Sequence, residues 1–192
     1  AALYTNTTGA ANTAIGRSAL YTNNADNNTA IGQRALFSNT TGTKNTAIGN
    51  NALDANTTGN NNVAIGRQAL DANTTANNNT AIGTESLTAN TTGTHNVGCG
   101  YATLESNTTA DNNTAVGSVA LNGATTGGHN TAVGSHALDV VSTGEKNTAV
   151  GSNALGANTV SENTAVGYYA LSTNSTGTYN TAMGVQAMHL NT

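Results

Sequence analysis

A five-residue motif, Asn-Thr-Ala-Ile-Gly, recurs along the whole chain and constrains its fold more than any other feature. The motif first occurs at 12–16 and last at 180–184, where Met replaces Ile. Its eleven copies begin 17 residues apart, or 16 in two places, and their first Asn and last Gly never change. Self-similarity at a fixed period predicts a repeat architecture. Residues 1–192 are therefore interpreted as a single array.

One full unit, 45–61, reads Asn-Thr-Ala-Ile-Gly-x-x-Ala-Leu-x-x-Asn-Thr-Thr-Gly-x-x. A period of 17 is too short for a helix pair or a propeller blade, and the apolar residues do not fall at helical spacing. We therefore predict an all-β fold, a β-solenoid of about eleven coils. Neighbouring coils would lie about 4.8 Å apart and build a rod on the order of 50 Å long.

The two invariant positions predict structural roles. Identical amides at coil spacing favour an Asn ladder along the rod. The Gly indicates a backbone conformation, or a close approach, that a Cβ atom would forbid. Representative positions are Asn12, Gly16, Asn45, Gly49, Asn62, Gly66, Asn113, Gly117, Asn180 and Gly184. A Leu column, five residues after the Ile position, predicts a second line of core residues.

Side chains alternate along a strand, so the Thr and Ile positions share one face and the Ala position has the other. Val replaces Thr twice, and Val, Cys or Met replaces Ile, which indicates that this face lines the coil interior. The Ala position accepts only Ala or Gly, which predicts that another chain packs closely against it. The candidate inter-chain packing residues are Ala14, Ala30, Ala47, Ala64, Ala81, Gly98, Ala115 and Ala132.

Composition argues against several classes of partner. The formal net charge is -4 and the five Lys and Arg residues are dispersed, whereas nucleic-acid binding needs a basic cluster. No apolar run is long enough to cross a bilayer. No cofactor is expected. Because both ends of the sequence lie within the repeat, we expect a slice of a longer polypeptide, with its targeting signal and anchor elsewhere.

Few side chains suggest chemistry, and we assign no catalytic or metal-binding residue. Asp54 and Asp71 would stack about 5 Å apart in neighbouring coils, a spacing compatible with a cation or a glycosidase pair, but a solvated acidic patch is the simpler interpretation. Cys99 falls in the Ile column and is predicted to be a buried apolar residue. The histidines are predicted to be solvated.

Two surface features remain open at this stage. Tyr101, Tyr168 and Tyr169 occupy variable, exposed columns and could stack on sugar rings. The Asn-Thr-Thr triplets match the N-glycosylation acceptor, although a role as the return turn of each coil explains their regularity.

The repeated pentad, and Asn62-Val63-Ala64-Ile65-Gly66 above all, resembles the head repeats of YadA-like trimeric autotransporter adhesins. The 17-residue unit with Ala-Leu and Asn-Thr-Thr-Gly is similar to repeats of phage tail fibres. This resemblance implies a left-handed parallel β-roll and a side-by-side homotrimer. It also implies an extracellular location, on a virion fibre or a cell surface.

The leading hypothesis is a non-enzymatic structural and adhesive segment of an extracellular trimeric fibre. Its variable columns would meet a host surface glycan or a protein receptor, with no nucleic acid bound and no membrane insertion by this segment. One alternative is an ice-binding β-solenoid, because flat Thr arrays can order water, although Val63 and Val97 interrupt the array. Another is a polysaccharide-cleaving fibre, which would need paired acids in a groove.

Overall fold

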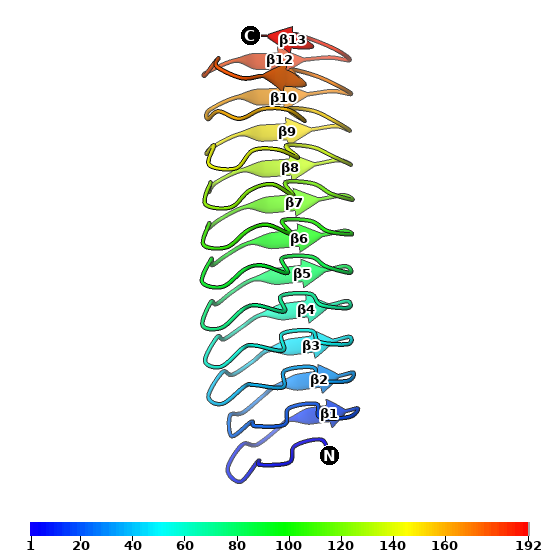
Figure 1. Cartoon of the computed structure of the whole chain (residues 1–192), viewed down its shortest axis with the longest axis vertical. Helices are drawn as coiled ribbons and strands as arrows, with labels where there is room; N and C mark the ends of the chain where they lie inside the picture. The colour runs from blue at the N-terminus through cyan, green and yellow to red at the C-terminus, as the bar shows by residue number, and fades with distance from the viewer. Residues whose placement is uncertain (192) are drawn as a thin grey trace.

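The computed structural model describes residues 1–191, which wind into a straight rod of stacked coils without a helix (Figure 1). Each pentad contributes one three-residue strand. The strands are β1 (Thr13–Ile15), β2 (Thr29–Ile31), β3 (Thr46–Ile48), β4 (Val63–Ile65), β5 (Thr80–Ile82), β6 (Val97–Cys99), β7 (Thr114–Val116), β8 (Thr131–Val133), β9 (Thr148–Val150), β10 (Thr164–Val166), β11 (Thr173–Asn174), β12 (Thr181–Met183) and β13 (Leu190–Asn191).

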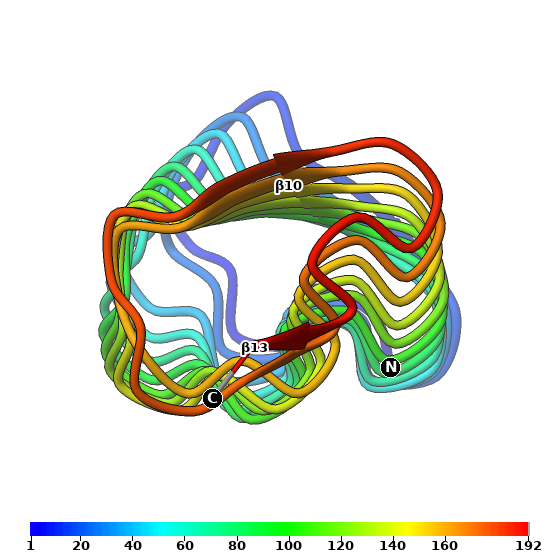
Figure 2. The same cartoon turned by 90° about the horizontal axis from the view of Figure 1, so that it is seen from above.

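Parallel pairing between successive coils builds one long sheet. Its 11 strands follow the order β1 to β10 and then β12, and each strand pairs with its counterpart in the next repeat, as Ala47 pairs with Ala64. A small parallel sheet of β11 and β13 lies on the opposite wall (Figure 2). The predicted β-solenoid of about eleven coils is therefore confirmed.

The coil interior is lined by the Ala column and the Leu column. The central residue of the strand is fully buried in β2 to β5, and Leu36, Leu53 and their counterparts have no exposed surface. The outer two residues of these strands, by contrast, are half-buried or exposed. The predicted core role of Leu is confirmed, but the predicted inside and outside of the strand are wrong and must be exchanged.

The reason for this exchange is the narrow cross-section of a coil. A Cβ atom added to Gly98, in the Ala column, would lie 2.5 Å from Ser86 Oγ and 3.6 Å from a methyl group of Leu87. The opposite wall thus leaves no space in this column for a side chain larger than Ala. The Ala column is therefore restricted to small residues because the coil interior is narrow, and not because another chain packs against it.

The proposed inter-chain packing residues are corrected accordingly. Ala14, in the first coil, is partly buried, and the others are buried within a single chain. These interior residues are Ala30, Ala47, Ala64, Ala81, Gly98, Ala115 and Ala132.

Each coil turns its corners with left-handed backbone. In the unit that begins at Asn62, Gly66 has a φ of 136°, Gln68 a φ of 57° and Leu70 a φ of 52°. Left-handed geometry costs a non-Gly residue about 1–2 kcal/mol, which burial of a Leu side chain, at about 1.5–3 kcal/mol, offsets. At Gly66 a Cβ atom would also lie 2.4 Å from the carbonyl oxygen of Gly83. Both predicted reasons for the invariant Gly are thus confirmed.

The pentad Asn forms a ladder of a different kind from the one predicted. Asn45 Oδ1 accepts the backbone N–H of Asn62 at 2.9 Å, and Asn45 Nδ2 donates to the carbonyl of Gly59 at 2.8 Å, which closes its own coil. The same pattern recurs along the column, mostly without direct contact between amides. Its partners are backbone groups because the Asn side chain lies at a corner where coil and turn meet.

The amide-to-amide ladder occurs instead in the Asn-Thr-Thr turns, whose Asn side chains point into the rod. Asn56 Nδ2 donates to Asn39 Oδ1 at 2.8 Å, and Asn73 Nδ2 donates to Asn56 Oδ1 at 2.9 Å. Five such bonds link the six members Asn23, Asn39, Asn56, Asn73, Asn90 and Asn107. Ala124 and Val141 then interrupt the column, which resumes between Asn158 and Asn174.

Candidate functional site

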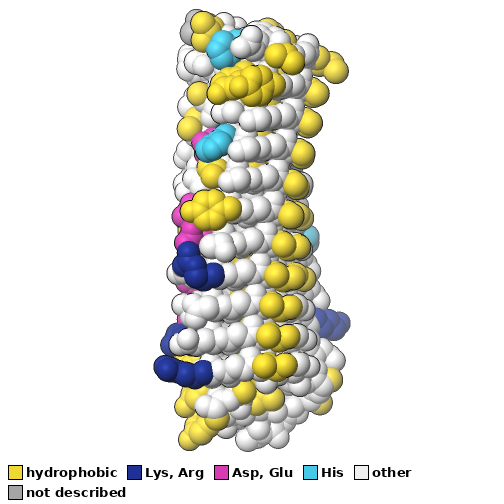
Figure 3. Space-filling view, turned by 90° about the vertical axis from the view of Figure 1, so that its right-hand side faces the viewer, with side chains coloured by type: hydrophobic (Ala, Val, Ile, Leu, Met, Phe, Trp, Pro, Cys, Tyr) yellow, Lys and Arg dark blue, Asp and Glu magenta, His cyan; other side chains and the backbone are white. Residues whose placement is uncertain are grey.

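The outer face of the long sheet is a surface of uniform chemistry that runs along the rod. It consists of the first and third residues of β1 to β10 and β12, and we call it the outer sheet face. The first residue is Thr except at Val63 and Val97, and the third is Ile, Val, Cys or Met. No charged side chain stands at any of these positions. The third-residue column forms the continuous hydrophobic stripe on the right of Figure 3.

The apolar side chains of this face remain accessible to solvent in the single chain. Ile82 is 39% exposed, and Val116, Val133 and Val150 are each 38% exposed. Eleven three-residue strands at about 4.8 Å spacing present an area on the order of 500 Å². This area includes the Thr column, so the apolar column alone is a patch of a few hundred Å², and exposed apolar patches of that order are often functional.

The Thr hydroxyls of the outer sheet face differ from those of the turns. Turn residues Thr40, Thr57 and Thr74 each donate to a backbone carbonyl of the next coil, at 3.0 to 3.3 Å. Among the side-chain hydrogen bonds within residues 1–191, none involves a strand Thr hydroxyl of the outer sheet face. Those hydroxyls are therefore available to water or to another molecule.

Cys99 belongs to this face. The sequence predicted a buried apolar residue, whereas the structure places its side chain outward and only partly buried among Ile and Val side chains. The correction follows from the exchange of the two strand faces.

The variable columns form a second surface, made of the two residues that follow the pentad Gly and the residue that follows Leu. Ion pairs tie neighbouring coils together here: Arg34 contacts Asp54 at 2.7 Å, and Arg67 contacts Glu85. Tyr4, Tyr21 and Phe37 stack along the same surface, with ring centroids about 5 Å apart. Exposed ion pairs such as Arg34–Asp54 and Arg67–Glu85 contribute about 0–1 kcal/mol each to stability.

The carboxylates considered as a candidate pair lie on this surface. Asp54 binds Arg34 through Oδ2, while its Oδ1 is buried without a partner within residues 1–191. Burial, followed by the negative charge of Asp54, raises the pKa of Asp71 above its usual range. Across residues 1–191 there is no group of three or more His, Cys, Asp or Glu side chains that could hold a metal ion.

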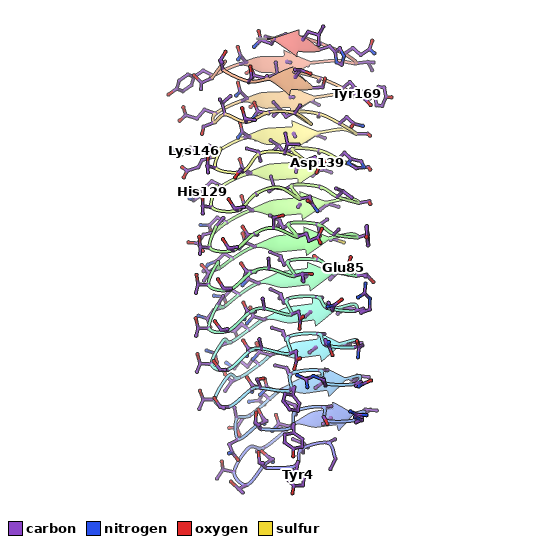
Figure 4. The ribbon with its side chains drawn as sticks, viewed as in Figure 1. Tyr4, Glu85, His129, Asp139, Lys146 and Tyr169 are labelled. Carbon is purple, nitrogen blue, oxygen red and sulfur yellow. The ribbon has the colours of Figure 1, made fainter. Side chains whose placement is uncertain are left out.

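The three candidate ligand-facing tyrosines do not form one site. Tyr101 is 55% exposed and lies several coils from the other two. Tyr168 is 51% exposed and packs its ring edge against Tyr169, with centroids 4.5 Å apart. Figure 4 shows Tyr169 projecting from the side of the rod, near the C-terminal end.

Five of the six Asn-Thr-Thr acceptors are buried, and Asn6, in the first coil, is half-buried. Asn39, Asn56, Asn73, Asn90 and Asn107 have no exposed surface, and their amide nitrogens donate inside the rod. The triplets are therefore structural in these coils, as the turn interpretation predicted.

Sequence reasoning missed both the outward direction of the Thr and Ile columns and a small pocket beside Tyr169. Exchange of Thr with Val at one position is itself typical of a solvent-facing strand residue, and this signal could have shown the correct face. Within residues 1–191 no helix is long and apolar enough to cross a membrane. No family model, curated protein or solved structure matches the chain.

Proposed function

We propose that this chain is a non-enzymatic structural segment of an extracellular trimeric fibre, whose three copies pack side by side through the outer sheet face. The observation that carries the proposal is an uncharged Thr and Ile/Val surface that runs the full length of the rod and has no partner in the single chain. Burying it between chains would remove apolar surface from water, at about 25 cal/mol per Å². The variable columns would then face outward to a host glycan or a protein receptor.

The mass in solution tests this assembly. Sedimentation equilibrium should give three times the 19.1 kDa of the chain. Ile48→Glu places a charge in the middle of the outer sheet face, where the side chain is half-buried rather than core, and should yield folded monomers. Thr58→Glu, on an exposed turn, is the matched control and should remain trimeric. A wild-type chain that sediments as a monomer would refute the proposal.

Cys99 offers a second, geometric test. If three outer sheet faces meet, the thiols of neighbouring copies come together, and mild oxidation should give covalent dimers but no covalent trimers, because each chain has one Cys. Formation of the dimer should be lost in Ile48→Glu and kept in Thr58→Glu. Oxidation that yields no dimer from a trimeric sample would place the interface on another face.

Ice binding is the second candidate, because the strand Thr hydroxyls face outward, without partners in the described chain, at regular coil spacing. The same face cannot be buried in a trimer and bound to ice, so the two proposals exclude each other. A monomer with thermal hysteresis that Thr80→Glu abolishes would favour ice binding. A trimer without hysteresis at high concentration would eliminate it.

A further inference from the structure

A small open pocket of about 210 Å³ interrupts the surface of the rod near its C-terminal end. Thr173 of β11 is one of its lining residues, and β11 pairs with β13. Figure 2 shows β13 on the wall opposite the long sheet. The outer sheet face is therefore not part of it, and packing through that face leaves it open. Its principal lining residues are Asn153, Gly156, Tyr169, Ser172, Thr173 and His189.

One lining position of the pocket, the residue after Leu, has no side chain in this unit. In the unit that begins at Asn130, the residue after Leu contacts the residue three positions earlier, since Asp139 Oδ2 lies 3.0 Å from His136 Nδ1. Asp71 and Gln68 occupy the same two positions in the unit that begins at Asn62. In the unit that begins at Asn147, the corresponding pair is Asn153 and Gly156. Gly156 has no side chain to fill the space, so a notch opens between coils.

The walls of this notch are aromatic on one side and polar on the other. The ring of Tyr169 meets the ring of His189 at an interplanar angle of 72°, with centroids 5.7 Å apart. Ser172 Oγ contacts His189 Nδ1 at 2.7 Å, which fixes the imidazole against the wall. Asn153 Oδ1 and Thr173 Oγ1 make no hydrogen bond within residues 1–191. No Asp, Glu, Lys or Arg lines the notch.

This combination favours a neutral ring that carries hydroxyl groups. An aromatic face binds the C–H side of a sugar ring through apolar contact, while an amide oxygen and a hydroxyl can bind its hydroxyl groups. With no Asp, Glu, Lys or Arg in the lining, a cationic ligand finds no carboxylate, and the imidazole of His189, already bound to Ser172, is the one side chain that could pair with an anion. A volume of about 210 Å³, equal to about seven water molecules, suits one monosaccharide unit.

We propose that this notch is a subsite for one neutral monosaccharide unit, held by Tyr169, Asn153 and Thr173. The inference rests on the proposed adhesive role, since it names the ligand class and its location. The two are nevertheless tested by different measurements. The trimer is judged by mass, and the subsite by ligand contact, so either can fail alone.

Saturation-transfer NMR on the assembled protein provides the test, with galactose, glucose and N-acetylglucosamine as separate probes. At least one should receive saturation on its ring C–H protons, with a Kd in the millimolar range. Gly156→Asp restores the filler found in other coils and should weaken the signal at least tenfold. The substitution is tolerable, because Gly156 is outside the left-handed region and an added Cβ would lie no closer than 3.2 Å to Asn153 O and 3.5 Å to His136 O.

Three tyrosine variants distinguish binding in this pocket from non-specific binding to exposed aromatic rings. Tyr169→Ala should abolish the transfer and Tyr169→Phe should retain most of it. Tyr101→Ala, which removes an exposed ring in a different coil, should leave the transfer unchanged. Absence of transfer to all three sugars, or equal transfer in Gly156→Asp, would overturn the inference. Stronger binding of glucuronate than of glucose would overturn its claim of neutrality.

Discussion

Two irregular regions of the interior respond differently to a departure from the repeat. Around β6, Ser86 and Thr103 replace the usual Ala, and Gly98 replaces another Ala. Ser86 Oγ and Thr103 Oγ1 lie 2.7 Å apart, and Ser86 Oγ also donates to the carbonyl of Gly98 at 3.2 Å. The missing methyl group at Gly98 thus makes room for two hydroxyls that satisfy each other.

The second region lacks such compensation. Ala124 and Val141 stand where the turn Asn belongs, and both are fully buried. Asn107 Oδ1, the last acceptor before this gap, is buried without a partner. A buried polar atom of this kind costs about 1–3 kcal/mol. The comparison teaches that the repeat tolerates interior polar groups when they arrive as a matched set, and loses stability when one column simply stops.

The largest effect is expected where the turn Asn ladder is continuous. Asn73→Ala would leave Asn56 Oδ1 without its donor, would remove one acceptor of Asn90 Nδ2 and would open a small cavity. We expect a loss of about 3 kcal/mol, measured as a fall in the denaturation midpoint and faster amide exchange in adjacent coils. Val141→Ala, which removes only apolar contacts, should cost about 1–2 kcal/mol. Equal losses would contradict the distinction between the two regions.

The next largest effect on stability is expected around β6, where Ser86, Gly98 and Thr103 fit together. Gly98→Ala would place a Cβ 2.5 Å from Ser86 Oγ and 2.9 Å from Thr103 Oγ1. Overpacking of this kind costs about 1–3 kcal/mol. The triple variant Ser86→Ala, Thr103→Ala, Gly98→Ala restores the common pattern and should recover most of the thermal midpoint. If the triple variant is no more stable than Gly98→Ala, the three residues are not coupled.

Restoring the ladder across the gap should be cooperative. Ala124→Asn gives Asn107 Oδ1 a donor but creates a new unpaired acceptor that faces Val141, so its net effect should be near zero. Ala124→Asn with Val141→Asn joins the two ladder segments and should stabilise the protein by about 1–2 kcal/mol. Chemical denaturation of both single variants and the double variant checks this, and simple additivity would argue against a continuous ladder.

The smallest effect lies on the surface rather than in the interior. Because the pKa of Asp71 is raised, its ionised form destabilises the fold at pH 7, and this penalty disappears as the pH falls through the folded-state pKa. Asp71→Asn should therefore stabilise the protein at pH 7 by no more than about 0.5 kcal/mol, given solvent screening. The difference from wild type should vanish below pH 3.8, the ordinary value. If Asp71→Asn stabilised the protein more at low pH than at pH 7, the pKa of Asp71 would be lowered by folding rather than raised.

Much of the architecture was predictable from sequence, because a fixed repeat length places like residues one above another in successive coils. The strand at each pentad, the parallel register and the Leu core all follow from columns of like residues. Strand alternation, however, separates two faces without saying which one is inside. The Ala column settles the question only when the width of the interior is known, and that width depends on where the chain turns.

The site could be predicted only in part, for a related reason. Tyr168 and Tyr169 were identified as exposed, but the notch beside Tyr169 depends on the absence of a side chain at Gly156 and on contacts between units. Likewise, the turn Asn was recognised as a turn residue, while its inward direction depends on the left-handed corner at Leu70 and its counterparts. Contacts between side chains of different coils could not be predicted from the sequence of a single repeat.

The stacked glycines carry a consequence for how such a rod can vary. A Cβ atom at Gly16, Gly32 or Gly49 would strike the carbonyl of the next Gly, so every junction repeats one geometry without adjustment. Gain or loss of a whole unit by unequal recombination therefore creates no novel junction. The length of the rod can therefore change during evolution by whole repeats, while each coil keeps the same fold.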